Sequence, residues 1–270
     1  NLLAAVGRGQ LSVLDGYQRQ ALANGAGELI ALSAAQVAEL EPEVAAVAGL
    51  LSPTTGIIDS HAFMLSLQGQ FEQAGGVTAF TTPVTELKRK GSELIVYSDD
   101  FAVSCNTLIN SAGHGAPELA AGLNSDAARA YYARGHYYGY RGRPPFSRLV
   151  YPIAEPGGLG VHVTIDLGGQ VKFGPDVEWV ETLDYRFDDS RRDAFAAAIA
   201  RYFPALDPDR LEPGYVGIRP KISAPDQAAA DFRIATAADH GIPGLINLLG
   251  IESPGLTSAL AIAEEVAAAC

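Results

Sequence analysis

The sequence has few cysteines, a deficit of basic residues and no long apolar run. Only two of its 270 residues are cysteine, Cys105 and Cys270, which gives neither a disulfide framework nor the paired spacing of a metal site. The 19 Lys and Arg residues are scattered among 31 Asp and Glu residues, and the net charge of −12 excludes a nucleic-acid-binding surface. No apolar run approaches the ~20 residues of a transmembrane helix. We therefore predict a cytoplasmic protein, with a peripheral membrane location left open, and no metal, nucleic acid or membrane span.

What the sequence does contain is an alternation of helix and strand patterns. Apolar spacing, caps and Gly or Pro stops predict helices over residues 12–27, 32–43, 56–76, 190–203 and 256–269, with Ser33 and Asp59 as N-caps. Short strands are predicted over 77–84, 93–100, 101–105, 107–113 and 244–250. Residues 128–222 are rich in Tyr, Gly, Pro and β-branched residues, which favours an antiparallel sheet. The fold class is therefore mixed α/β, with two interleaved domain types.

The chain closes on "LGIESPGLTSALAIAEEVA", residues 249–267. Here Ser253 can cap a helix, Pro254 suits its first position, and Gly255 leaves the backbone bare. Such a helix start exposes N–H groups at the positive end of the dipole, which suit an anion or a polarised carbonyl. The alternative is an ordinary helix packed by its own apolar face, made of Leu256, Leu260, Ala263 and Val266.

A hairpin is predicted in "LGVHVTIDLGGQVKF", residues 159–173. The alternation places His162 on the polar face, and Gly168-Gly169 reads as a two-residue turn. That turn sets the pairs Leu167 with Gln170, Asp166 with Val171, and Thr164 with Phe173. His162 would then be half-buried among apolar side chains, either as a functional group or as a structural histidine bonded to a neighbour.

Two cations share one face of the strand pattern "GYVGIRPKIS", residues 214–223. Arg219 and Lys221 alternate with apolar residues, and the Arg fork can grip a carboxylate through two hydrogen bonds. In so acidic a chain this predicts an anion site, and the alternative is a salt bridge to one of the acidic side chains.

Five segments together resemble the flavin-dependent oxidoreductases of the D-amino-acid oxidase type: "TPVTEL", "TLINSAGHGAPELA", "GLGVHVTIDLGG", "GYVGIRPKIS" and "GLINLLGIESPGLTSALAIAEEV". The likeness is nearest to the L-2-hydroxyglutarate dehydrogenase/oxidase branch and covers essentially the whole chain. It implies FAD, and pieces of an FAD/NAD(P)-binding-type domain interleaved with a largely antiparallel-sheet substrate domain. The implied substrate domain comprises residues 1–50 and 125–235, and the implied FAD-binding domain comprises 51–124 and 236–270.

The resemblance also implies roles for particular residues. His162 is similar to the base that takes the hydroxyl proton of the substrate, Arg219 to the carboxylate clamp, and Lys221 and Tyr137 to further substrate contacts. The terminal helix start would face the pyrimidine edge of the flavin. The implied cofactor-binding residues are Val84, Ala112, Gly113, Gly250, Ile251, Ser253, Pro254, Gly255, Leu256 and Thr257.

The sequence departs from the family in one respect. Members begin with a strand, a GxGxxG turn and a helix that hold the FAD pyrophosphate, and no such unit is present. The nearest imitation, Gly113-His114-Gly115, has Glu118 at the third glycine position, where its charge would repel a pyrophosphate. We therefore expect the nucleotide-binding unit to be encoded upstream of Asn1.

The predicted function is the oxidation of a 2-hydroxy acid, similar to L-2-hydroxyglutarate, to the 2-oxo acid by hydride transfer to FAD. Oxygen, or a quinone or other electron carrier, would take the electrons onward. Two alternatives stay open at this point: an amino-acid or amine oxidase of the same fold, and a non-catalytic fragment that binds a small anion.

Overall fold

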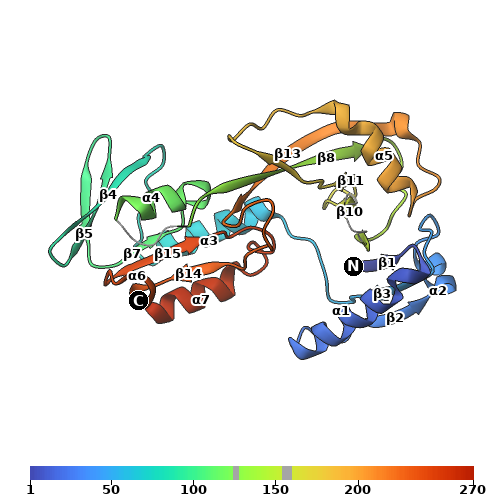
Figure 1. The fold of residues 1–270 in the computed structure, drawn as a ribbon, viewed down its shortest axis with the longest axis horizontal. Helices are drawn as coiled ribbons and strands as arrows, with labels where there is room; N and C mark the ends of the chain where they lie inside the picture. The colour runs from blue at the N-terminus through green and yellow to red at the C-terminus, as the bar shows by residue number, and fades with distance from the viewer. Residues whose placement is uncertain (124–127, 154–159) are drawn as a thin grey trace. The chain divides into compact units, whose positions relative to one another are not determined.

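The computed structural model describes residues 1–123, 128–153 and 160–270, whose fold is drawn in Figure 1. The described chain divides into two compact units that alternate along the sequence. Unit 1 comprises Asn1–Gln70, Gly135–Glu178 and Tyr185–Gly217, and unit 2 comprises Phe71–Arg134, Trp179–Asp184 and Ile218–Cys270. The chain passes between units inside the long strands β8 (Tyr131–Tyr140) and β13 (Leu211–Lys221). The domain boundary predicted at residues 124 and 125 lies outside the described residues.

The main sheet has the strand order β12-β8-β11-β10-β9-β1-β3-β2, and β13 also pairs with β8. Antiparallel pairing joins β9 to β10, β10 to β11 and β11 to β8, whereas β1 and β9 are parallel. The antiparallel sheet predicted for the Tyr- and Gly-rich segment is therefore confirmed. The remaining strands of this sheet are β1 (Leu2–Ala5), β2 (Ile30–Ser33), β3 (Ala48–Leu51), β9 (Val150–Pro152), β10 (His162–Ile165), β11 (Val171–Gly174) and β12 (Glu178–Val180).

The helices of the first half begin where their caps predict. Ser33 caps α2 (Ala34–Leu40) in a capping box, in which Gln36 Oε1 accepts from the Ser33 backbone at 2.9 Å. Asp59 accepts from the N–H of Ala62 at 3.0 Å at the start of α3 (Ser60–Gln73). The chain passes from unit 1 to unit 2 within α3, after Gln70. Unit 1 also contains α1 (Leu11–Ala23) and α5 (Arg192–Ala200), with short 3₁₀ turns η1 (Arg8–Gln10), η3 (Asp189–Arg191) and η4 (Pro208–Arg210).

The core of unit 1 is aromatic. Tyr138 and Phe173 are fully buried on neighbouring strands, and α5 packs Phe195 edge-on against Tyr138 with ring centroids 4.8 Å apart. Tyr202 and Phe203, just after α5, are buried in the same cluster. Because β8 alternates across the sheet, its core-facing residues leave Tyr137 on the opposite face.

The predicted register of the β10–β11 hairpin is wrong by one residue. The observed pairs are Ile165 with Val171, Thr164 with Lys172, Val163 with Phe173, and His162 with Gly174. The reason is Asp166, whose carboxylate accepts from the N–H groups of Gly168 and Gln170, each at 2.9 Å. This side chain closes a three-residue loop with Gly169 at φ +78° in place of a two-residue turn. The slip puts Val171 and Phe173 in the core and leaves His162 facing a glycine.

Unit 2 holds two small sheets. The antiparallel sheet comprises β4 (Val84–Lys90), β5 (Glu93–Ser98) and β6 (Ala102–Cys105). In the second sheet β15 (Leu245–Leu249) pairs in parallel with β7 (Leu108–Asn110) and antiparallel with β14 (Arg233–Ala235). Figure 1 shows α4 (Ala116–Gly122) and α7 (Ala259–Ala269) on opposite sides of this second sheet, and the short α6 (Ala237–His240) precedes β15.

The strand predicted over residues 77–84 is wrong for most of its length, because β4 begins only at Val84. The hydroxyl groups of Thr81 and Thr82 both donate to the carbonyl of Phe80 at 2.8 Å, and Thr81 has a φ of +52°. These local bonds turn the chain and compete with strand pairing.

Within the described residues, no helix is both long enough and apolar enough to cross a lipid bilayer.

Candidate functional site

One face of the unit 1 sheet carries a row of residues from five strands. His162 on β10 lies opposite Gly174 on β11, and the neighbouring pairings continue the row to Tyr151 on β9 and to Tyr137 on β8. Tyr215 on β13 stacks on Tyr137. Residues opposite one another in register share a face, so these five, which we call the aromatic row, lie together on the side away from the core.

Ring contacts hold the aromatic row together. Tyr151 stacks on His162 with ring centroids 4.2 Å apart, and Tyr137 stacks on Tyr215 at 4.4 Å with the planes 11° apart. Burial raises the pKa of the Tyr151 phenol, and the nearby Tyr137 phenol adds to the shift. Burial likewise raises the pKa of Tyr215, against a hydrogen bond from Tyr137 that lowers it. The phenols of Tyr151 and Tyr215 are therefore protonated at neutral pH and can donate hydrogen bonds, and the Tyr151 ring lies against the imidazole of His162.

Asp176 stabilises the backbone of β8, the strand that contains Tyr137. Its carboxylate accepts from the backbone N–H of His136 at 2.7 Å, contacts Nδ1 of the same histidine at 3.1 Å, and accepts from Nε of Arg191. The His136 and Asp176 side chains are fully buried. Because a buried carboxylate needs such partners, this network fixes the backbone one residue before Tyr137.

Gly174 allows Tyr137 and the backbone of β8 to pack closely against β11. Its φ is +147°, and a Cβ added there would lie 2.8 Å from Cδ1 of Tyr137 and 2.5 Å from the carbonyl oxygen of His136. We expect Gly174→Ala to lower the free energy of unfolding by about 2 kcal/mol through overpacking, as measured by urea denaturation. Gly217→Ala is the control, since no atom lies within 4 Å of its Cβ position. Equal losses in both variants would contradict the overpacking.

In unit 2, predicted cofactor residues follow the carboxyl ends of two parallel strands. Ala112 and Gly113 come shortly after β7, and Gly250 comes directly after β15. Gly113 has a φ of +58°, and no atom lies within 4 Å of the position that its Cβ would take. Ligands of open α/β sheets bind outside the carboxyl ends of the strands, so both segments lie at the edge where a nucleotide cofactor is expected.

Two buried asparagines tie these strand ends together. Asn110 Nδ2 donates to Asn247 Oδ1 and to the carbonyl of Ala116, each at 2.9 Å, and Asn110 Oδ1 accepts from the N–H of Ala112 at 3.3 Å. The pair therefore sets the shape of the loop that leads to Gly113.

The prediction that Ser253 caps a helix with Pro254 in its first position is wrong, because α7 begins at Ala259. The segment from Gly250 to Thr257 is a turn instead. The Thr257 hydroxyl donates to the carbonyl of Pro254 at 2.8 Å, and the regular helix starts only at Ala259. Ser253, Gly255 and Leu256 also lie in this turn, at the carboxyl end of β15.

Arg219 and Lys221 lie near the end of β13, where both are partly buried. Lys221 Nζ forms an ion pair with Glu252 of the following turn segment, and the two side chains are 18% and 14% exposed. For Lys221 the structure thus contains the salt bridge that the sequence left as an alternative. Its contact with a substrate, like the clamp at Arg219, stays a prediction.

His114 links the β7 loop to β13. Its imidazole hydrogen-bonds to the backbone of Ile218, one residue before Arg219, and burial lowers the pKa of the ring in spite of this bond. Tyr132 packs edge-on against it with centroids 5.6 Å apart. A neutral His114 therefore connects the segment around Gly113 with the strand that carries the predicted clamp.

The predicted site residues thus fall into two groups. The structure brings His162 and Tyr137 into the aromatic row of unit 1, and places Arg219 and Lys221 on the unit 2 part of β13. Val84 stands at the start of β4, paired with Ser98. No group of three or more His, Cys, Asp and Glu side chains in the described part of the chain could hold a metal ion.

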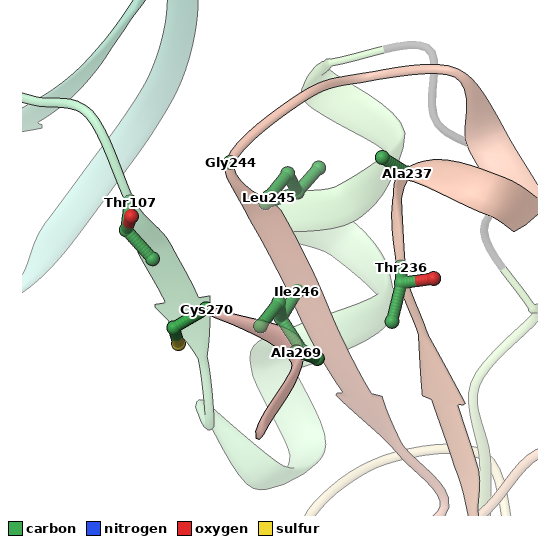
Figure 2. Close-up of a pocket in the computed structure, with 8 residues that line it drawn as sticks. All are labelled: Thr107, Thr236, Ala237, Gly244, Leu245, Ile246, Ala269 and Cys270. Atoms are coloured by element: carbon green, nitrogen blue, oxygen red, sulfur yellow. The ribbon is translucent and has the colours of Figure 1, made fainter. Parts of the chain in front are cut away.

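Two cavities of unit 2 lie at different positions along the parallel strands β7 and β15. A cavity of about 550 Å³ lies between α7 and the sheet, with Ile251 and Gly255 among its lining residues. A cavity of about 290 Å³, shown in Figure 2, is lined by Thr107 and Gly244 at the amino ends of β7 and β15, and by Cys270 at the end of the chain. The cavity in Figure 2 therefore lies at the strand edge opposite the predicted cofactor residues.

Sequence reasoning missed four residues of these groups: Tyr151, Gly174, Tyr215 as a stacking partner, and Glu252. An Asp at the start of a Gly-rich turn often accepts hydrogen bonds from backbone N–H groups of that turn, which favours a longer loop. This signal at Asp166 predicts the observed register, in which His162 pairs with Gly174. The Lys221–Glu252 contact has no sequence signal, because its partners lie 31 positions apart in the chain.

Comparison with known proteins identifies the class. Residues 2–269 match the family described as FAD dependent oxidoreductase. The fold is similar to that of L-alpha-glycerophosphate oxidase from Mycoplasma pneumoniae, whose structure has FAD bound, with a TM-score of 0.82 and 24% identity over 99% of this chain and 71% of that one. The chain therefore belongs to the FAD-dependent oxidoreductases, which confirms the resemblance, the fold class and the family cofactor predicted from the sequence.

Within this class the sequence is similar to L-2-hydroxyglutarate dehydrogenases. It is 41% identical to the mitochondrial enzyme of that name from Arabidopsis thaliana, over 98% of this chain and 65% of the relative. It is 24% identical to the Escherichia coli K12 enzyme of that name, over 87% of this chain and 64% of the relative. The chain thus spans slightly less than two thirds of the length of these relatives.

Proposed function

We propose that this chain is part of an FAD-dependent oxidoreductase that converts a 2-hydroxy acid of the L-2-hydroxyglutarate type to the 2-oxo acid. The observation that carries the proposal is the 41% identity to the Arabidopsis L-2-hydroxyglutarate dehydrogenase over 98% of the chain. The aromatic row around His162 supports it, because a 2-hydroxy acid needs a base and hydrogen-bond donors at its hydroxyl group.

The residues at the carboxyl ends of β7 and β15 fit the cofactor. The left-handed Gly113 lies in open space and exposes backbone, and the Gly250–Thr257 turn follows the neighbouring parallel strand. We propose that these segments, with Val84, contact FAD, which when bound supplies the acceptor for the hydride from the substrate Cα. We propose that residues 51–124 and 236–270 belong to an FAD-binding domain and residues 1–50 and 125–235 to a substrate domain. The alternation of two units along the chain supports two interleaved domains, although the units change at residues 70, 134 and 217 and not at these bounds.

In this proposal His162 takes the proton of the substrate hydroxyl as the Cα–H bond breaks, so that the carbon–oxygen bond becomes a carbonyl. Arg219 holds the carboxylate next to the reacting carbon through two hydrogen bonds. Tyr137 lines the substrate side of the sheet. A cytoplasmic location remains a prediction, and the Arabidopsis relative is named as mitochondrial.

The test is anaerobic titration of the purified complete protein, with the nucleotide-binding unit expected upstream of Asn1, using L-2-hydroxyglutarate. We expect a yellow protein whose flavin absorbance near the visible maximum bleaches with this acid and responds less to lactate or to amino acids. Faster bleaching by an amino acid would favour an amine oxidase instead. A colourless protein that binds a dicarboxylate would favour a non-catalytic binding module. Turnover with oxygen or with a quinone then identifies the electron acceptor.

A further inference from the structure

The Lys221–Glu252 ion pair joins the end of β13 to the turn that follows β15. Both side chains are more than four-fifths buried, at 18% and 14% exposure. Charges held this far from water need a partner, and removing one of them leaves the other uncompensated. The pair therefore constrains where the turn can lie.

Packing and backbone bonds reinforce the same junction. Gly250 has a φ of +69°, and a Cβ there would lie 2.9 Å from Cγ1 of Ile222, the residue after Lys221. The N–H of Glu252 donates to the carbonyl of Gly250 at 2.9 Å, and the carbonyl of Glu252 accepts from the N–H of Gly255. The backbone of Glu252 thus forms hydrogen bonds within the turn, and its side chain forms the ion pair with Lys221 of β13.

We propose that Lys221 is a positioning residue, which through Glu252 holds the Gly250–Thr257 turn in the shape that binds FAD. This rests on the proposed function, in which that turn contacts FAD. Because Glu252 neutralises the charge of Lys221, the ion pair affects the affinity for FAD. Other residues then determine the selectivity for a dicarboxylate over a monocarboxylate.

The experiment compares Lys221→Met, Glu252→Gln and the charge-swapped double variant Lys221→Glu/Glu252→Lys in the holoenzyme. We expect the dissociation constant of FAD, measured by flavin fluorescence, to rise ~10- to 100-fold in each single variant. The charge swap should recover at least half of that loss on a logarithmic scale, since it restores opposite charges. The ratio of kcat/KM for 2-hydroxyglutarate to that for lactate, at saturating FAD, should stay constant.

The matched control is Glu212→Gln on the same strand. Glu212 pairs with Arg141 at 3.5 Å, but both side chains are more than half exposed, so its loss should leave FAD affinity unchanged. If Lys221→Met does not fold, Lys221→Arg keeps the charge and should retain FAD, whereas loss of FAD in Lys221→Arg overturns the proposal.

A different pattern would overturn the positioning role. If Lys221→Met selectively lowers kcat/KM for the dicarboxylate while FAD affinity is unchanged, and Glu252→Gln does not, then Lys221 contacts the substrate. The positioning role is also contradicted if both single variants keep the FAD affinity and the substrate selectivity of the unmodified protein. Failure of the proposed function is distinguishable, because the unmodified protein would then bind no FAD or show no reduction by a 2-hydroxy acid.

Discussion

Replacing His162 with Ala is expected to slow flavin reduction by 2-hydroxyglutarate by ~10²-fold or more while FAD stays bound. The imidazole is half-buried, stacks on Tyr151, and lies opposite Gly174 in the register of β10 and β11. Alanine removes the group that accepts the proton, and the neighbouring phenols, whose pKa values burial raises, are poor bases at neutral pH. Stopped-flow absorbance under anaerobic conditions measures the rate.

The control for this variant is His61→Ala. His61 is an exposed residue in the first turn of α3, so its loss should leave the rate of flavin reduction unchanged. If His162→Ala reduces flavin as fast as the unmodified protein, His162 is not the base. The histidine would then be a structural member of the aromatic row.

Replacing Arg219 with Lys is expected to lower kcat/KM for the preferred acid ~10- to 150-fold. Lysine keeps the charge but loses the two-pronged geometry, and one charge-assisted hydrogen bond contributes ~1.5–3 kcal/mol. FAD affinity should barely change, because the substitution leaves the Lys221–Glu252 pair and the turn in place. Steady-state kinetics on 2-hydroxyglutarate and lactate, with a fluorescence titration of FAD, separate the two effects.

Arg141→Lys serves as the control for the clamp. Arg141 is exposed and pairs with Glu212 at 3.5 Å on the surface, where exchange of one cation for another should cost little. An Arg219→Lys variant with the kinetics of the unmodified protein would remove the clamp and leave an amine oxidase as the better hypothesis.

The sequence was most informative where local signals decide the structure. The caps at Ser33 and Asp59 are confirmed because a cap depends on a side chain and on N–H groups two or three residues away. The mixed α/β class could be predicted because apolar residues recur every second residue in strands and about every 3.6 residues in helices. The family could be predicted because five segments resemble it in the same order along the chain.

Local signals failed where a competing local bond was overlooked. Asp166 closes a longer loop than Gly168-Gly169 suggests, and this one side chain moves the whole hairpin by a residue. The start of α7 was misplaced for a similar reason, since the turn from Gly250 to Thr257 uses its carbonyls in tight turns before the helix begins.

By itself the sequence determined the family, the fold class, the cofactor of the family and the candidates His162, Arg219 and Lys221. Only the tertiary structure decided what surrounds them. The aromatic row joins Tyr151, His162, Tyr137 and Tyr215 from strands up to 78 residues apart, and the Lys221–Glu252 pair joins a strand to a distant turn. Such contacts depend on strand order and register, which arise from the packing of the whole sheet, so no local pattern in the sequence encodes them.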